Sequence, residues 1–299
     1  MKIGIFGMGA VGASILNEMG EYDNLYILAN EERINKYKST KLIINDKEFS
    51  PKYISKGKMD LIIVCLKNYH LEKSLSDIEK FVDDNTIILP LLNGIMAHDI
   101  LSNYFKANRV LYGVINVEAN KINNIVKTSK IINLQFGYEY NNPIKPEILA
   151  IKEIFDKYNI RNNIYENMKR RVWLKWMLNM GINQISALCN ATYKDMSHPL
   201  LKELMTDIYK EVYTVSVAYN IGLTEDDLNE TIKSMDKFKS NRVTSLTIDF
   251  YNNEQNELDS FSKTLIDLAK EKNIATPINE ILYKLLKSLD DNKRQKGLI

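Results

Sequence analysis

The chain has 299 residues, enough for two domains that each bury their own core or for one large domain. Its 40 basic and 38 acidic residues leave a net charge of +2, which gives no indication of nucleic acid or an anionic membrane as a partner. Hydrophobic residues make up 45 %, as in globular proteins, and no apolar run is long enough to span a bilayer.

The cysteines and histidines argue against a disulfide-linked protein and against a metalloprotein. Cys65 and Cys189 lie in apolar segments without CxxC spacing, so we expect buried free thiols rather than a disulfide. The three histidines lack the spacing of metal ligands, and no metal site is expected. The sequence begins with a strand pattern instead of a signal peptide, which predicts a cytoplasmic protein.

A glycine-rich turn lies between the first strand pattern and the first helix pattern. Residues 1–6 form a short apolar run, residues 7–12 read GMGAVG, and residues 13–19 have helical character. This order binds the pyrophosphate of a dinucleotide at the start of the helix. Ordinary turns also contain glycines, but this position between strand and helix favours a cofactor. The predicted cofactor residues here are Gly7, Met8, Gly9, Ala10, Val11 and Gly12.

The rest of the first half alternates strand and helix patterns, which predicts a mostly parallel, doubly wound sheet. A helix is expected after the strand 61–66, through residue 81. Antiparallel strands are expected between residues 122 and 140, of which 130–136 is the clearest. The strands are expected at residues 24–29, 61–66, 86–90 and 110–115.

From residue 167 onward helical periodicity dominates. The predicted architecture is therefore a Rossmann-like α/β domain, residues 1–166, followed by an all-α domain, residues 167–299. A ligand is expected at the carboxyl ends of the strands, facing the helical half. The helices are expected at residues 168–188, 200–219, 225–235, 240–251 and 260–272, with a last one from residue 277.

Two polar groups follow predicted strands. Lys67 comes directly after residues 61–66, and Asn93 with Gly94 comes shortly after residues 86–90. Strand ends are where this fold contacts its ligand. A solvated loop lysine and an ordinary turn are the alternatives, and both remain open.

The predicted helix 168–188 carries Lys175, Asn179 and Asn183 at intervals of four residues, so the three side chains share one face. The rest of that stretch is strongly apolar. Burial can lower the pKa of a lysine toward neutrality, which suits a proton donor. A surface stripe or a polar contact between helices is the alternative. Farther along, Ser245 and Asp249 lie one helical turn apart.

Glu257 precedes the next predicted helix. For Asp249 and Glu257 taken alone, a solvated helix face is favoured, because most carboxylates in helical proteins are exposed.

Taken together, these motifs resemble the ketopantoate reductases (2-dehydropantoate 2-reductases) over nearly the whole chain. The glycine loop, Leu66–Lys67, Asn93–Gly94, the Lys175 helix, and Ser245 with Glu257 recur there in this order and spacing. The Lys175 helix is the most specific part of the likeness.

The resemblance implies NADPH-dependent reduction of 2-dehydropantoate to pantoate, a step in pantothenate and coenzyme A biosynthesis. Lys175 would be the general acid, and Glu257 would pair with it or with the substrate. Leu66, Lys67 and Asn93 would lie by the cofactor. The substrate would be held by Asn93, Lys175, Asn179, Asn183 and Ser245.

The end of the second strand departs from the family pattern. Asn30 stands where the family often has an arginine for the ribose 2′-phosphate, and Glu31 and Glu32 follow it. Acidic side chains here usually favour the 2′-hydroxyl of NADH, whereas Arg33 is available for a phosphate. NADPH is therefore expected, with NADH as the alternative.

The family often has a small residue two positions after the Asn–Gly pair, and here Met96 takes that place. A reductase for another small 2-oxo acid, or an opine-type enzyme, is thus an alternative, and so is a nucleotide-binding sensor without catalysis. The protein is expected to be a monomer or a homodimer.

Overall fold

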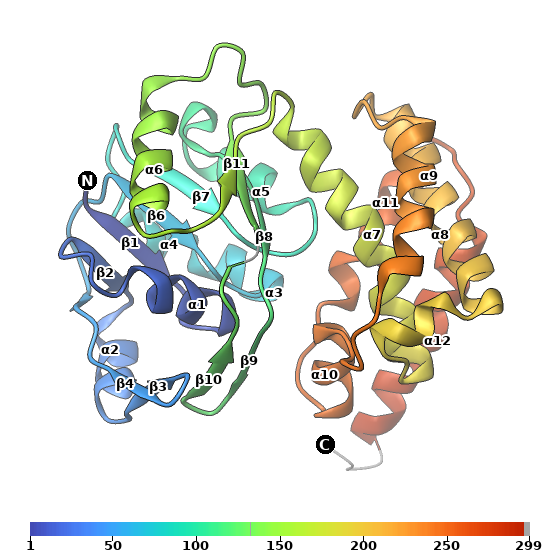
Figure 1. Ribbon diagram of the computed structural model, residues 1–299, viewed down its shortest axis with the longest axis horizontal. Coiled ribbons are helices and arrows are strands. Elements are labelled where there is room, and N and C mark those ends of the chain that lie inside the picture. Colours follow the sequence, from blue (N-terminus) through green and yellow to red (C-terminus); the bar gives the residue numbers. More distant parts are fainter. Residues whose placement is uncertain (132, 296–299) are drawn as a thin grey trace. The chain divides into compact units, whose positions relative to one another are not determined.

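The computed structural model describes residues 1–131 and 133–295 (Figure 1). The chain divides into two compact units, Met1–Arg171 and Val172–Ile299. The first contains strands and helices, and the described part of the second is helical. The predicted fold class, a Rossmann-like α/β domain followed by an all-α domain, is confirmed. Within the described ranges, no helix is long and apolar enough to cross a membrane.

A parallel five-stranded sheet forms the centre of the first unit. Its order is β5-β2-β1-β6-β7, and every neighbouring pair is parallel. All residues of β1, β6 and β7 are buried, because helices cover both faces, and this explains their unbroken apolar sequences. The strands are β1 (Ile3–Phe6), β2 (Leu25–Leu28), β5 (Tyr53–Ile54), β6 (Leu61–Val64) and β7 (Ile87–Pro90).

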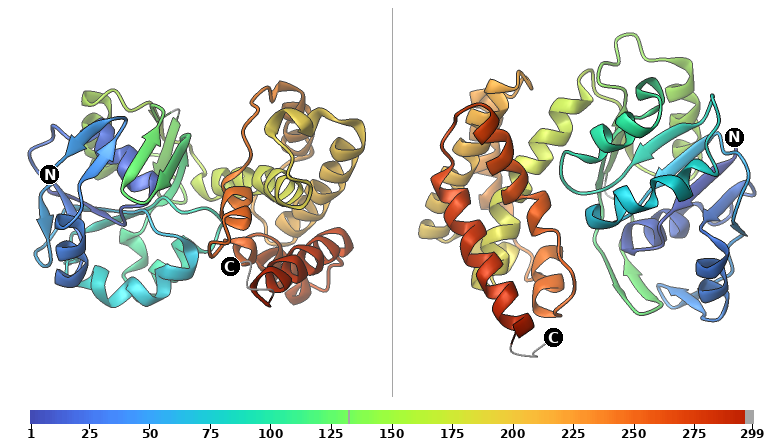
Figure 2. Two further views of the ribbon diagram at one scale, coloured as in Figure 1. Left: turned by 90° about the horizontal axis from the view of Figure 1, so that it is seen from below. Right: turned by 180° about the vertical axis from the view of Figure 1, so that it is seen from behind.

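Helices pack on both faces of this sheet (Figure 2). Alternate residues along each strand belong to the core on one face or to the core on the other. Helices α1 (Ala10–Met19) and α6 (Pro146–Lys157) contribute to the core that contains Ile63. Helices α4 (Leu75–Glu79) and α5 (Ala97–Tyr104) contribute to the core on the other face. The parallel strands therefore end at one shared edge, from which the loops that follow them lead.

Two smaller sheets complete the first unit. The order β4-β3-β10-β9 includes an antiparallel β9–β10 hairpin, and β12-β11-β8 includes the antiparallel pair β11–β8, so the antiparallel prediction for residues 122–140 is confirmed. Residue 132, within the predicted strand 130–136, lies outside the described residues. The strands are β3 (Leu42–Ile44), β4 (Lys47–Phe49), β8 (Tyr112–Asn116), β9 (Ala119–Ile122), β10 (Ile125–Thr128), β11 (Asn133–Gly137) and β12 (Asn162–Asn163).

The prediction that residues 110–115 join the parallel sheet is wrong. Only Val110 forms a parallel bridge, to Ile88, and the chain then enters β8, which pairs with β11. Gly113 allows β8 to pass close to the end of β7, since a Cβ there would lie 2.2 Å from the Pro90 carbonyl oxygen. An apolar run indicates a buried strand but does not determine its partner.

The helix expected through residue 81 is interrupted. It consists of α3 (Asn68–Leu71), η1 (Glu72–Ser74) and α4. Three further helices, α2 (Glu31–Lys38), α5 and α6, and the 3-10 turn η2 (Ala107–Arg109) were not predicted. The strands β3, β4 and β5, which have two or three residues each, were not predicted either. Elements this short carry little periodicity.

The helices of the second half follow the predicted ranges closely, except for residues 240–251. That helix begins at Ser245, because the Thr244 hydroxyl accepts a hydrogen bond from the Thr247 N–H and caps it there. The helices are α7 (Met168–Cys189), α8 (Pro199–Ala218), α9 (Glu225–Ser234), α10 (Ser245–Tyr251), α11 (Ser262–Glu271) and α12 (Pro277–Gln295), with η3 (Tyr193–Ser197), η4 (Met235–Lys237) and η5 (Leu258–Ser260).

The two thiols differ in environment. Cys65 is buried beside β6, as predicted, and burial raises the pKa of its thiol. Cys189, the last residue of α7, is exposed, so the prediction of a buried thiol is wrong there. The apolar sequence around it belongs to the buried faces of α7, while the helix end reaches solvent.

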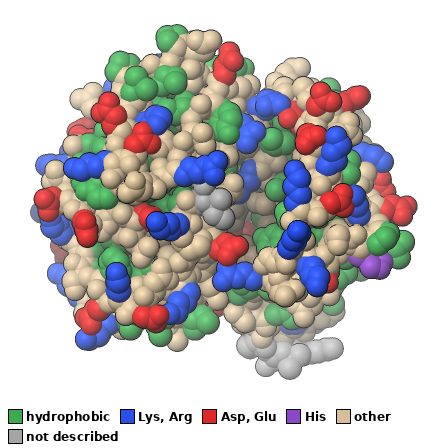
Figure 3. Space-filling model, in the orientation of Figure 1, with side chains coloured by type: hydrophobic (Ala, Val, Ile, Leu, Met, Phe, Trp, Pro, Cys, Tyr) green, Lys and Arg blue, Asp and Glu red, His purple; other side chains and the backbone are tan. Residues whose placement is uncertain are grey.

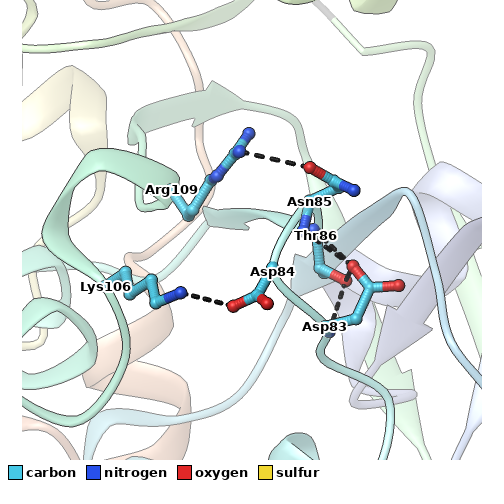
Figure 4. A network of polar contacts seen from close by, with 6 residues as sticks. All are labelled: Asp83, Asp84, Asn85, Thr86, Lys106 and Arg109. Atoms are coloured by element: carbon cyan, nitrogen blue, oxygen red, sulfur yellow. Dashed lines mark hydrogen bonds and ion pairs between the residues drawn. The ribbon is translucent and has the colours of Figure 1, made fainter.

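A polar turn fixes the entry into β7, at the edge opposite the strand ends (Figure 4). The Asp83 carboxylate accepts hydrogen bonds from the backbone N–H groups of Asn85 and Thr86, and the Thr86 hydroxyl donates to the Met59 carbonyl. These backbone hydrogen bonds lower the pKa of the Asp83 carboxyl. Lys106 pairs with the neighbouring Asp84. This cluster therefore stabilises the start of β7 and lies at the edge of the sheet opposite the loops that follow the strands.

A buried polar network joins the helices of the second unit. The side-chain amide nitrogen of Gln184 donates to the Asn279 side chain at 3.1 Å, and Ser262 donates to the Gln184 amide oxygen. At the start of α12, the Glu211 carboxylate accepts the backbone N–H groups of Ile278 and Asn279 at 2.8 and 3.0 Å. Glu211 on α8 is thus the N-terminal cap of α12.

Replacing Glu211 by alanine should lower the free energy of unfolding by about 1–3 kcal/mol, because several N–H donors lose a charged acceptor. Urea denaturation followed by circular dichroism measures the change. Glu203→Ala, at an exposed position of the same helix, serves as the control and should change stability by less than about 0.5 kcal/mol. Equal effects of the two substitutions would contradict the capping role.

Candidate active site

The three glycines of the N-terminal loop, Gly7, Gly9 and Gly12, differ in why a side chain would or would not fit there. Gly7 has φ = +106°, and a Cβ there would lie 2.5 Å from the Cys65 carbonyl oxygen. A Cβ at Gly12 would lie 2.0 Å from the Gly7 carbonyl oxygen. Gly9 is exposed, and the nearest atom to its Cβ position among the described residues is the Cys65 oxygen at 3.9 Å. The fold therefore requires Gly7 and Gly12, whereas Gly9 leaves space at the surface.

That space lies at the N-terminus of α1. Gly9 is the N-cap residue, and the first helical hydrogen bond runs from the Ala13 N–H to the Gly9 carbonyl. The N–H groups of Ala10, Val11 and Gly12 precede that bond in the first turn, where a helix offers donors and a positive dipole end. Together with the uncovered Gly9, this arrangement fits a dinucleotide pyrophosphate.

The residues after β2 form the start of α2. The Asn30 side chain accepts a hydrogen bond from the Arg33 N–H at 3.0 Å, and its amide group donates to Asp77 at 3.3 Å. Asn30 is therefore a helix cap, and its side chain is engaged within the protein. The Arg33 side chain donates to the Tyr37 hydroxyl at 3.1 Å and is exposed.

The loops after β6 and β7 are joined to each other. The Asn68 side-chain amide donates to the Asn93 carbonyl at 2.7 Å, and Lys67 is the N-cap residue of α3. The Leu66 side chain lies against Gly7, 3.0 Å from its Cβ position. The structure thus brings Leu66, Lys67 and Asn93 to the same sheet edge as the glycine loop, since β6 pairs with β1 in parallel.

In the second unit, α7 carries Lys175, Asn179 and Asn183 on one face, between buried residues such as Trp176 and Met180. Lys175 and Asn179 are half-buried, and Asn183 is 5 % exposed. Burial lowers the pKa of Lys175 to about 8, and the carboxylate of Glu257 acts in the opposite direction. An ammonium group with this pKa holds a proton at neutral pH and releases it more readily than an exposed lysine.

The prediction that Asp249 and Glu257 lie on a solvated face is wrong, since they are 8 % and 6 % exposed. The segment between α10 and α11 packs on α12, where the Asn256 side-chain amide donates to Asp290 at 3.2 Å. That packing removes Glu257 from solvent and places it near enough to Lys175 to act on its charge. Ser245, the first residue of α10, is exposed.

Sequence reasoning missed Lys121, in β9. Its ammonium group donates a hydrogen bond to the carbonyl of Met8 in the glycine loop. The sequence gives no signal for this contact, because 113 residues separate the two and the hairpin around Lys121 reads as ordinary polar strand. Among the described residues, no group of three or more histidine, cysteine or acidic side chains could hold a metal ion.

A parallel sheet with a glycine loop after its first strand, followed by a helical unit that carries the half-buried Lys175 and the buried Glu257, is the architecture of a Rossmann-type dinucleotide-binding protein. The family model described as "Ketopantoate reductase PanE/ApbA" matches residues 3–139, and the model of its C-terminal part matches residues 167–290. The chain belongs to the ketopantoate reductase family.

Among its relatives, an uncharacterised oxidoreductase, YkpB of Bacillus subtilis, is 26 % identical over 98 % of this chain and all of the relative. A 2-dehydropantoate 2-reductase of Pyrococcus horikoshii is 26 % identical over 96 % of this chain and 97 % of that protein.

Similar solved structures include a dimeric ketopantoate reductase from Staphylococcus aureus, with a TM-score of 0.83 and 18 % identity over 98 % of this chain and all of that one. A D-mandelate dehydrogenase in complex with NADH and anilino(oxo)acetate has a TM-score of 0.85 and 22 % identity over 98 % of this chain and 99 % of that one. Likeness at this identity shows the shared fold.

Proposed function

We propose that this protein reduces 2-dehydropantoate to pantoate with NADPH, in the biosynthesis of pantothenate and coenzyme A. The observation that carries the proposal is the half-buried Lys175 on α7, whose pKa of about 8 is balanced between burial and the carboxylate of Glu257. The 2-dehydropantoate 2-reductase of Pyrococcus horikoshii, similar over nearly the full length of both chains, supports the choice of substrate.

Residues 1–166 would hold the cofactor, which supplies a hydride when bound. The backbone of residues 7–12 would bind its pyrophosphate, as the uncovered Gly9 and the start of α1 suggest. Leu66, Lys67 and Asn93 follow β6 and β7 at the same edge and would contact the remainder of the nucleotide. Asn30 and Arg33 would lie beside the adenosine ribose, where Asn30 fixes the first turn of α2 through its hydrogen bond from the backbone N–H of Arg33.

Residues 167–299 would hold the substrate. Lys175 would protonate the ketone oxygen, and its positive charge would stabilise the negative charge that develops there, most strongly in the transition state. Asn179, Asn183 and Ser245 would bind the carboxylate and hydroxyl groups of the substrate. Glu257 would keep Lys175 protonated, since its carboxylate raises the pKa of that lysine.

A second candidate is a reductase for an aromatic 2-oxo acid. It is favoured by the D-mandelate dehydrogenase of the same fold, which binds NADH and anilino(oxo)acetate. Met96, the exposed N-cap residue of α5, follows the Asn93–Gly94 turn. It places a bulky side chain where the family often has a small residue. A non-catalytic nucleotide sensor is less favoured, because it has no need of a half-buried lysine with a lowered pKa.

A substrate panel tests the proposal. We expect kcat/KM for 2-dehydropantoate to exceed that for pyruvate and for phenylglyoxylate by about two orders of magnitude, because buried amide groups would be left unpaired by substrates without the hydroxyl. Initial rates of NADPH oxidation, repeated with NADH, measure this. Turnover of phenylglyoxylate without turnover of 2-dehydropantoate would establish the second candidate instead.

A further inference from the structure

The β9–β10 hairpin holds Lys121 against the glycine loop. The hairpin is attached to α1 by a hydrogen bond of 2.7 Å between the hydroxyls of Ser14 and Thr128, and Ser14 is buried. From this anchored position the half-buried Lys121 donates to the Met8 carbonyl. A cation is therefore fixed beside the residue that separates the first two glycines of the loop.

Arg33 on α2 acts on the charge of Lys121, and it also acts on His70 of α3 together with Lys73 of η1. Burial and the positive charge of Arg33 lower the pKa of Lys121. Burial, Arg33 and Lys73 lower the pKa of His70. Because Arg33 and Lys121 repel each other, an anion bound between them would be stabilised by relieving that repulsion.

The carboxylates near the end of β2 are either exposed to solvent or hydrogen-bonded to other side chains. Glu31 and Glu32 are exposed in the first turn of α2, where they favour the helix dipole. Asp77 accepts hydrogen bonds from Asn30 and Lys80. Acidic residues are thus present near the end of β2, and the hydrogen bonds described for Asp77 come from Asn30 and Lys80.

We propose that Lys121, together with Arg33, binds the 2′-phosphate of the adenosine ribose and gives this protein its preference for NADPH over NADH. The inference rests on the proposed function, in which a nicotinamide dinucleotide binds the glycine loop. The family often has an arginine for this phosphate where this chain has Asn30. The proposal assigns that role to Lys121, which lies in β9, far along the sequence from Asn30.

The position of the two cations favours the 2′-phosphate over the pyrophosphate. This fold holds the 2′-substituent of the ribose at the end of the second strand, which is where α2 presents Arg33. The pyrophosphate is expected at the N–H groups that follow Gly9, whereas Lys121 approaches the loop at Met8, before Gly9. A charge at Lys121 therefore contributes mainly to the ligand that carries the additional phosphate.

Calorimetric titration of nucleotides tests this without any turnover. The ligands are 2′,5′-ADP against 5′-ADP, and NADPH against NADH. The variants are Lys121→Gln, which retains a donor for the Met8 carbonyl, and Lys121→Arg, which retains the charge. Lys127→Gln is the matched control, because Lys127 lies on the same hairpin and pairs with Asp46 at an exposed site. Thermal denaturation of each variant reports on folding.

We expect Lys121→Gln to weaken 2′,5′-ADP and NADPH by about tenfold or more, the loss of a charge-assisted hydrogen bond, while 5′-ADP and NADH change by less than about twofold. Lys121→Arg and Lys127→Gln should bind all four ligands nearly as the wild type does. Equal losses for NADPH and NADH would move Lys121 to the pyrophosphate and overturn the proposal, as would unchanged binding. Failure of the wild type to bind any dinucleotide would instead overturn the proposed function.

Discussion

Replacing Lys175 by methionine should lower kcat by about two to four orders of magnitude, the effect of losing a positioned general acid. Affinity for NADPH should stay within about twofold, because Lys175 belongs to the helical half of the chain, which we do not expect to hold the nucleotide. Methionine keeps the length and apolar packing of the lysine stem on α7. Steady-state rates and a fluorescence titration with NADPH measure the two quantities separately.

The pH dependence of the reduction rate is a second test of Lys175 as the general acid. Lys175 donates its proton only when charged, so reduction should be constant at lower pH and fall as pH rises through about 8, the pKa of this group. Glu257→Gln removes the carboxylate that raises this pKa, and the falling limb should then shift to lower pH. A limb that stays in place would separate Glu257 from the proton donor.

The control for these measurements is Lys169→Met, in the first turn of the same helix. Lys169 lies 3.9 Å from Glu139 and is partly exposed, so its loss should leave kcat and the pH profile nearly unchanged. A Lys175→Met enzyme with wild-type kcat would remove Lys175 from the mechanism, and a loss of similar size in both variants would indicate damage to the helix instead of to the chemistry.

Local patterns predicted the parts of the fold that depend on local forces. The strands β1, β6 and β7 follow from apolar runs, and α7 and α8 follow from long stretches of helical periodicity. The glycine loop was found because it requires particular residues at fixed spacing: Gly7 adopts a positive φ and Gly12 packs against the loop backbone.

Features that depend on contacts distant in sequence were not predictable in this way. The burial of Glu257 results from packing of its loop on α12, and the pairing of β8 with β11 results from where β11 lies in the fold. Lys121 reaches Met8 only because the β9–β10 hairpin is bound to α1. Nothing in the composition near Glu257 and Lys121 distinguishes these two residues from exposed polar positions.

Replacing Gly9 by valine should weaken NADPH binding by about two orders of magnitude or more, equivalent to about 2.7 kcal/mol, while the protein stays folded. Gly9 has φ = −75°, which other residues adopt, and a Cβ would meet the Cys65 carbonyl oxygen only at 3.9 Å. The valine methyl groups would instead occupy the space in front of the first N–H groups of α1, where the pyrophosphate is expected. Calorimetric titration measures the affinity, and thermal denaturation should show a small change for a residue at the helix cap.

Gly12→Ala gives the contrast that makes this result specific. Its Cβ would lie 2.0 Å from the Gly7 carbonyl oxygen, so the loop backbone must shift and stability should fall by about 1–3 kcal/mol. A fold defect therefore appears as a loss of stability in Gly12→Ala, whereas an obstructed ligand site appears as a loss of affinity at nearly constant stability in Gly9→Val. Undiminished NADPH affinity in a folded Gly9→Val protein would show that the nucleotide does not lie on this loop, and the assignment of cofactor binding to residues 7–12 would then be wrong.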